Sequence, residues 1–220
     1  IVLAAASGGG VTGKVEGTDF TDSLLVGHTT TGTLSSALRN TGVGLDAMDA
    51  IASGDDNVGV GYQALTAITS GINNVAIGSY ALKTEDTGSN NVAIGRDALL
   101  NLNYDGHGLN VAVGYYAGRV HSTGTSNVCV GAYAGDAITT GSKNVAVGVY
   151  ALSGEDGNGT NVAIGYEALK VLNAGSDGEN VAVGYQAGKD ASTSVNNVFV
   201  GNKAGQNITT GSNNVVVGNQ

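Results

Sequence analysis

The sequence predicts an all-β protein, a parallel β-solenoid (β-roll) of about twelve short coils. Three observations support this prediction. A five-residue motif, Asn-Val-x-Val/Ile-Gly, recurs along almost the whole chain at steps of 17 or 19 residues. The motif carries two β-branched residues at spacing two, which suits an extended strand. Glycine accounts for 37 of the 220 residues and proline is absent, and proline would remove a backbone donor from a strand ladder.

The motif numbers the coil, with its asparagine at position one and its glycine at position five. The step is 17 residues except after Asn91 and Asn161, where it is 19, so a 70-residue unit repeats from about residues 40, 110 and 180. Ser23 opens a weaker copy at the N-terminal end. The asparagines at position one are Asn40, Asn57, Asn74, Asn91, Asn110, Asn127, Asn144, Asn161, Asn180, Asn197 and Asn214.

Position five is glycine in every copy, which indicates a bend or a backbone with positive φ. A coil of 17 residues is too short for a helical repeat, which needs about 33 residues or more. We therefore expect one strand over the motif, a second short strand over the following Tyr-x-Ala-Leu stretch, and a polar turn. The glycines are Gly27, Gly44, Gly61, Gly78, Gly95, Gly114, Gly131, Gly148, Gly165, Gly184, Gly201 and Gly218.

Stacking of such coils places each residue about 4.8 Å from its equivalent in the next coil. The position-one amides are then expected to bond along the stack as an asparagine ladder. Twelve coils would form a rod roughly 55–60 Å long. Residues 1–22 do not fit the period and are expected to be a cap or linker, which leaves 23–220 as the repeat domain.

Position three, between the two β-branched residues, is small and apolar in most coils, as at Ala76, Ala93 and Cys129. We expect the β-branched residues to fill the coil and position three to face outward. A strand that is apolar on both faces is typically buried on both, and so thin a coil encloses little core. The pattern therefore predicts lateral association, most simply three parallel copies in a homotrimer.

The motif resembles repeats of two kinds of fibrous protein. Asn-Val-Ala-Ile-Gly, at 74–78, 91–95 and 161–165, is similar to the Ser-Val-Ala-Ile-Gly rung of YadA-like heads in trimeric autotransporter adhesins. The longer form, Asn-Val-Ala-Val-Gly-Tyr-x-Ala-Gly followed by Thr-Thr-Gly, is similar to repeats of phage tail-fibre proteins. The resemblance covers about residues 23–220 and implies a left-handed β-roll in a three-chain bundle, used as a stalk or binding head. The coils here are longer than adhesin rungs.

Charge and composition argue against several functions. Asp plus Glu is 18 against 9 Lys plus Arg, a net charge of −9, which is unsuited to neutralising nucleic-acid phosphates. No apolar run approaches the roughly 20 residues of a membrane-spanning helix, so membrane insertion is not expected. The three histidines, His28, His107 and His121, share no motif. We interpret them as surface-loop residues and expect no enzyme activity.

Acidic pairs occur in the predicted turns, at Asp55-Asp56, Glu85-Asp86 and Glu155-Asp156. They could bind Ca²⁺ through several carboxylate oxygens, but solvated turns that keep a fibre soluble are the better interpretation. No other cofactor is expected. Cys129 is interpreted as a buried, unreactive thiol at the outward position three.

Tyrosines gather at positions six and seven, directly after the motif's glycine. An exposed row of rings could stack on sugar rings. The alternative is packing at an edge of the roll or between chains. The candidate ligand-contact residues at position six are Tyr62, Tyr115, Tyr166 and Tyr185.

Together these features predict a structural shaft and receptor-binding segment of a trimeric fibre, a phage tail fibre in preference to a bacterial surface adhesin. The expected partners are two further copies of the chain, a neighbouring fibre or baseplate protein, and a host cell-surface glycan or protein. The expected location is the virion, or the extracellular or cell surface. The alternative is a monomeric solenoid that binds polysaccharide or ice.

Overall fold

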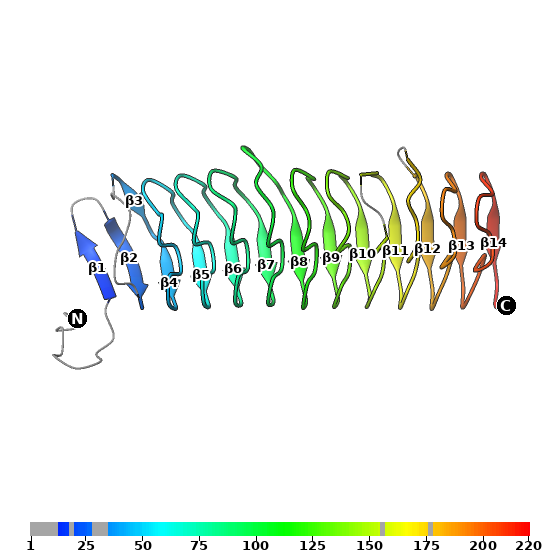
Figure 1. The fold of residues 1–220 in the computed structure, drawn as a ribbon, viewed down its shortest axis with the longest axis horizontal. Coiled ribbons are helices and arrows are strands. Elements are labelled where there is room, and N and C mark those ends of the chain that lie inside the picture. The colour runs from blue at the N-terminus through cyan, green and yellow to red at the C-terminus, as the bar shows by residue number, and fades with distance from the viewer. Residues whose placement is uncertain (1–12, 18–19, 28–34, 155–156, 176–177) are drawn as a thin grey trace.

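The computed structural model describes residues 13–17, 20–27, 35–154, 157–175 and 178–220. Within them the chain is an all-β parallel solenoid of about 11 coils of about 17 residues, with no helix. The coils stack along one axis into a rod (Figure 1). The strands are β1 (Gly13–Gly17), β2 (Phe20–Val26), β3 (Ala37–Leu38), β4 (Thr41–Val43), β5 (Val58–Val60), β6 (Val75–Ile77), β7 (Val92–Ile94), β8 (Val111–Val113), β9 (Val128–Val130), β10 (Val145–Val147), β11 (Val162–Ile164), β12 (Val181–Val183), β13 (Val198–Val200) and β14 (Val215–Val217).

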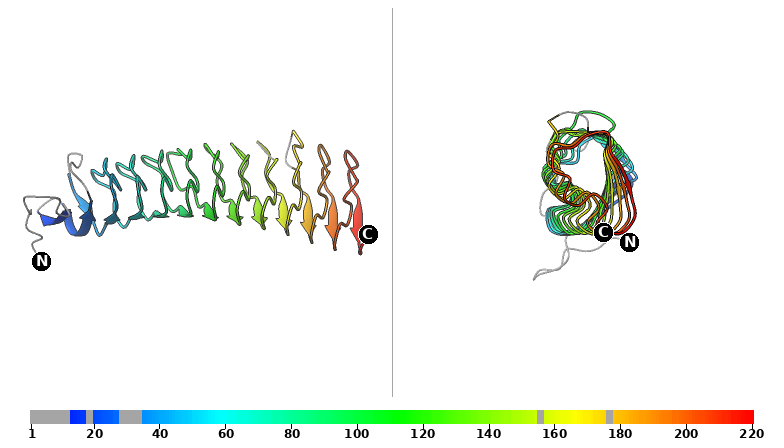
Figure 2. Two further views of the ribbon diagram at one scale, coloured as in Figure 1. Left: turned by 60° about the horizontal axis from the view of Figure 1, so that its bottom comes forward. Right: turned by 90° about the vertical axis from the view of Figure 1, so that its right-hand side faces the viewer.

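One sheet of 14 strands runs along the described rod. From β4 to β14 each strand is parallel to its neighbours and in register, so Ala146 in β10 lies opposite Ala163 in β11. β2 joins in the same way, with Leu24 opposite Thr41, so the weaker copy at Ser23 belongs to the stack. Viewed along the axis, the coils have similar outlines and shift gradually from one end of the rod to the other (Figure 2).

The N-terminal strand β1 pairs antiparallel with β2, Gly13 opposite Val26, and covers the edge of β2 that faces away from β4. The segment predicted as a cap or linker therefore contributes β1 and the beginning of β2. Residues 1–12 and 18–19 of that segment lie outside the described residues.

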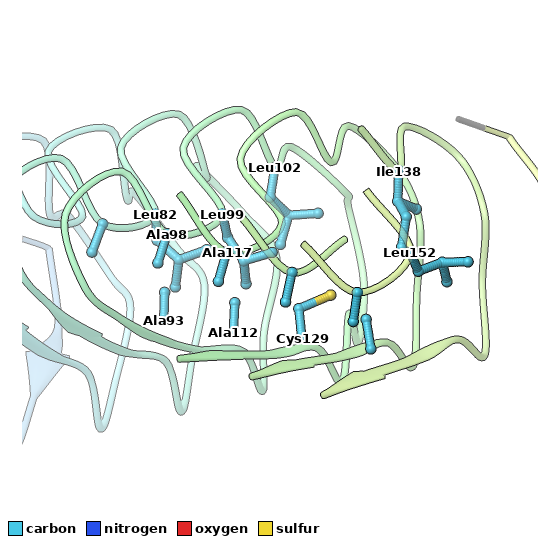
Figure 3. Close-up of a cluster of buried hydrophobic side chains, with 14 of the residues drawn as sticks. Leu82, Ala93, Ala98, Leu99, Leu102, Ala112, Ala117, Cys129, Ile138 and Leu152 are labelled. Carbon is cyan, nitrogen blue, oxygen red and sulfur yellow. The ribbon is translucent and has the colours of Figure 1, made fainter. Parts of the chain in front are cut away.

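The two faces of the strands are the reverse of the prediction. Position three points into the coil: Ala93, Ala112 and Cys129 are buried, and Figure 3 shows them pointing from the strands into the interior. Positions two and four point outward, and Ile77 is 39% exposed. Most coils have room for only a small side chain at position three, because larger side chains from the facing wall already fill the interior.

That facing wall consists of three columns of side chains. Position eight is a buried alanine in the described coils from Ala47 to Ala204. Position nine is Leu, Met or Gly, and position twelve is usually Ile or Leu, such as Leu99 and Leu102 in one coil. These larger side chains meet the position-three residues in the interior (Figure 3). The core is therefore one continuous column of small apolar layers.

The stretch after position five forms tight turns instead of the predicted second strand. Gln63 and Leu65 both have a φ of +53°, and Ala64 N–H donates to Gly61 O at 3.3 Å to close a turn. Residues that alternate into the left-handed region cannot continue an extended pleat. These turns still stack, because Leu65 N–H donates to Ala81 O of the next coil at 3.0 Å.

Candidate functional site

The asparagines of position one form a buried column along the rod. The backbone N–H of each asparagine from Asn57 to Asn214 donates to the side-chain Oδ1 of the preceding one at 2.9–3.2 Å. Side-chain amides also bond along the column, as Asn57 Nδ2 does to Asn40 Oδ1 at 3.1 Å. In the first copy Ser23 Oγ accepts from Asn40 N–H at 2.8 Å. The column's polar groups are engaged inside the protein, so it links coils and does not present a ligand site.

The position-five glycines form the corner after each strand, with φ between +99° and +143°. A β-carbon at Gly131 would lie 2.7 Å from the carbonyl carbon and oxygen of Gly148 in the next coil. Glycine is thus required both by the backbone conformation and by the close approach of successive coils. The glycine column, like the asparagine column, therefore allows successive coils to stack.

The position-six tyrosines are exposed but do not form one row. Tyr166 and Tyr185 stack with ring centroids 5.4 Å apart. Tyr115 stacks on its neighbour Tyr116 at 4.0 Å, and Tyr62 meets Tyr80 edge-on at 5.1 Å. The four predicted residues are 39–48% exposed. Only Tyr166 and Tyr185 are therefore brought together, and each of the four packs part of its ring on another tyrosine.

Cationic side chains lie over the position-seven rings. Arg119 lies 4.8 Å from the centroid of Tyr116, Lys83 lies 4.9 Å from that of Tyr80, and Lys170 lies 5.1 Å from that of Tyr150. Such cation–π contacts stabilise the rings on the surface. The four tyrosines at position seven are half-buried.

A hydrogen-bonded polar network adjoins the Tyr166–Tyr185 pair. The carboxylate of Glu167 accepts from Lys170 at 2.7 Å, Gln186 at 2.8 Å and Lys189 at 3.1 Å. The hydrogen bond from Lys170 lowers the pKa of Glu167 to about 2. The stacked rings and the partly exposed ammonium groups of Lys170 and Lys189 offer an apolar face with polar donors beside it.

The histidines differ in their surroundings. His107 is exposed on a loop, as predicted, with its Nδ1 2.6 Å from Asn90 Nδ2. His121 is fully buried at position twelve, so its interpretation as a surface residue is wrong. Its Nδ1 lies 3.1 Å from Gly118 O, and its Nε2 has no hydrogen-bond partner among the described residues. Burial lowers the pKa of His121 to about 4. His28 lies outside the described residues.

The acidic pairs are not all solvated turns. Glu85 is fully buried at position twelve, where its Oε1 accepts from Gly88 N–H at 2.7 Å and burial raises its pKa. Asp56 accepts from Arg39 at 2.6 Å, and Asp55 accepts from Leu38 N–H at 2.8 Å. The pair at 155–156 lies outside the described residues. Sequence reasoning missed that position twelve is an interior column, which the recurrence of Ile and Leu there would have indicated.

Cys129 is buried at position three, facing the interior and not outward as predicted. Burial raises the pKa of its thiol to about 12, so the thiolate needed for reactivity does not form near neutral pH. Within the part of the chain that the structure describes, no three His, Cys, Asp or Glu side chains gather to hold a metal ion.

The outer face of the sheet is apolar, as predicted, but positions two and four form it instead of position three. We call it the outer stripe: the residues at positions two and four, from Leu24 and Val26 in β2 to Val215 and Val217 in β14. Except at the last strand, whose residues are 74% and 72% exposed, these side chains are half-buried, reaching 39% exposure at Val43. The stripe is apolar throughout except for Thr41.

The columns and the stacked parallel strands define an all-β solenoid repeat protein. No family model, curated protein or solved structure matches the chain. None of the described residues belongs to a helix that could cross a membrane.

Proposed function

We propose that the chain is a structural shaft and receptor-binding segment of a homotrimeric fibre, a phage tail fibre in preference to a bacterial surface adhesin. The observation that carries the proposal is the uniform stacking of coils into a rod. Successive coils are joined by strand pairing, by stacked tight turns and by the asparagine column. A load along the axis is then shared by many hydrogen bonds per coil. The preference for a tail fibre rests on the longer motif and its resemblance to tail-fibre repeats.

In this proposal the shaft acts by mechanics and multivalency. Three copies present identical surface features at fixed spacing, so weak contacts to a host surface add through effective concentration. One end joins a neighbouring fibre or baseplate protein. The location is then the virion, or a cell surface if the fibre is an adhesin.

Deletion of one 70-residue unit, residues 110–179, tests the shaft role. The deletion joins Leu109 to Asn180 in the same coil position as the native Leu109–Asn110 bond, so the stack can close. We expect a folded rod that is shorter by four coils, about 19 Å, in electron micrographs. A deletion variant that loses the whole fold, or keeps the full particle length, would contradict a shaft of interchangeable coils.

The solution mass of the intact chain tests the homotrimer. Sedimentation equilibrium should give three times the chain mass of 21.7 kDa. A mass of one chain would favour the alternative, a monomeric polysaccharide-binding solenoid. The deletion experiment would still report on the stack in that case.

The proposed receptor contact is the Tyr166–Tyr185 pair with the Glu167 network. If a host glycan stacks there, Tyr185→Ala should weaken binding of that glycan about two- to tenfold by calorimetry, since one aromatic contact is worth about 0.5–1.5 kcal/mol. Tyr62→Ala is the matched control, because Tyr62 is similarly exposed but packs on a different tyrosine. Equal loss from both variants would argue against a local site at residues 166–185.

A further inference from the structure

The outer stripe is a long apolar face on the described part of the rod. It runs over twelve strands, β2 and β4 to β14, and its side chains are half-buried or exposed, with Val43, Ile77 and Ile164 at 38–39% exposure. A continuous apolar face of this length on a protein in water indicates a surface that is covered by a partner.

Charge separates the stripe from the rest of the chain. The protein has 18 acidic and 9 basic residues, yet positions one to five carry no charged residue in any motif copy. Copies with a net charge of −9 repel one another wherever their charged surfaces meet. The stripe is a long apolar face, among the described residues, on which two copies can meet without opposing like charges.

The geometry of the stripe also selects its partner. Its side chains form ridges that repeat with the strand spacing, about 4.8 Å, from β2 to β14 in one sheet. A partner that packs into these ridges along the whole rod needs the same spacing over the same length. Another copy of this chain has that spacing, and parallel copies place equivalent coils at the same height.

We propose that the outer stripe is the surface through which parallel copies of this chain associate, in register, coil against equivalent coil. This inference rests on the proposed homotrimer and names the face that builds it. The β-branched side chains at positions two and four of one copy pack against those of the next. The tight turns, the tyrosines after position five and the longer loops then remain on the outside of the assembly.

Lysine substitution on the stripe tests the contact. Ile94→Lys combined with Val147→Lys places two charges at the centre of the proposed interface. We expect the mass by sedimentation to fall from three chains to one, with an unchanged far-ultraviolet circular dichroism spectrum. The matched control is Ser70→Lys with Thr140→Lys, two exposed positions outside the stripe, which should retain the wild-type mass.

Cysteine cross-linking tests the register with a milder change. In a Cys129→Ala background, which uses the residue found at position three in neighbouring coils, Ile94→Cys should form covalent dimers with a short bismaleimide. Antiparallel copies that overlap fully would instead link Val60→Cys in β5 to Val183→Cys in β12 in a mixture of the two variants, and that result would overturn the parallel register.

The outcomes separate this inference from the proposed function. If the wild type is a trimer but the stripe lysines leave its mass unchanged and Ile94→Cys gives no cross-link, the stripe is not the interface and the fibre proposal stands. If the wild type has the mass of one chain, both the stripe interface and the homotrimer fail. In that case the deletion of residues 110–179 still decides whether the rod is built of interchangeable coils.

Discussion

The ring of Phe199 occupies the interior space beside the α-carbon of Gly205, so that a β-carbon at position 205 would overlap the ring. Gly188, one coil earlier, has the same relationship, with its missing β-carbon 2.5 Å from Phe199 Cδ2. Coils with Ala76 or Ala93 at position three instead carry leucine at position nine. Volume is thus exchanged between the strand and the facing wall while the coil keeps its cross-section.

This exchange predicts a strong coupling between the two positions. Phe199→Ala should destabilise the protein by about 3–5 kcal/mol because it leaves a cavity. Gly205→Leu should destabilise it by about 1–3 kcal/mol through overpacking. The double variant restores the alanine–leucine pairing of other coils. Its loss of unfolding free energy should therefore be smaller, by at least about 1 kcal/mol, than the sum of the losses of the two single variants. Denaturant unfolding of the four proteins measures this, and strictly additive losses would mean that the two sites do not share one space.

The repeat predicts the stack and its register because asparagine and glycine recur where only they fit. The orientation of the strands could not be predicted in the same way. The alternation of residues along the strand shows that both of its faces are apolar. Which face points into the coil depends on the volume that residues such as Leu99 and Leu102 already occupy in the interior. The tight turns were hidden because Leu65 is compatible with a strand, although its φ is positive. At the candidate site, the sequence identified Tyr166 and Tyr185 but gave no sign that the rings pair.

The asparagine column predicts a graded response to substitution. Asn127→Ala removes two hydrogen bonds. Asn127 Oδ1 accepts from Asn144 N–H at 2.9 Å, and Asn127 Nδ2 donates to Gly141 O at 2.8 Å. Each buried group left unpaired costs about 1–3 kcal/mol, so a loss of about 2–5 kcal/mol in unfolding free energy is expected. Asn127→Ser is the matched control, because Ser23 already accepts the equivalent N–H in the first copy, and it should cost less. Equal losses from alanine and serine would argue that the amide column contributes little.

The glycine column predicts intolerance of even one methyl group. Gly131→Ala forces a φ of +131° and a β-carbon 2.7 Å from the carbonyl group of Gly148. We expect a loss of about 3 kcal/mol or more, measured by thermal or denaturant unfolding. Gly218→Ala separates the two causes, since its φ is +142° but nothing lies within 4 Å of its β-carbon position. That control should cost about 1–3 kcal/mol, and a similar loss at both sites would mean that the approach of successive coils is not limiting.

Acid should destabilise the protein through His121. Burial lowers the pKa of this imidazole to about 4 in the folded state, against about 6.5 in an unfolded chain. As pH falls below 6.5 the unfolded chain takes up a proton that the folded chain refuses, so stability declines between pH 6.5 and 4 and then levels off. The difference amounts to about 3 kcal/mol. His121→Leu, which places at position twelve the residue found at Leu102, should remove this decline while Asp and Glu groups contribute equally in both proteins. Unfolding free energies measured at pH 7 and pH 4.5 compare the two, and parallel pH profiles would show that His121 is not the group responsible.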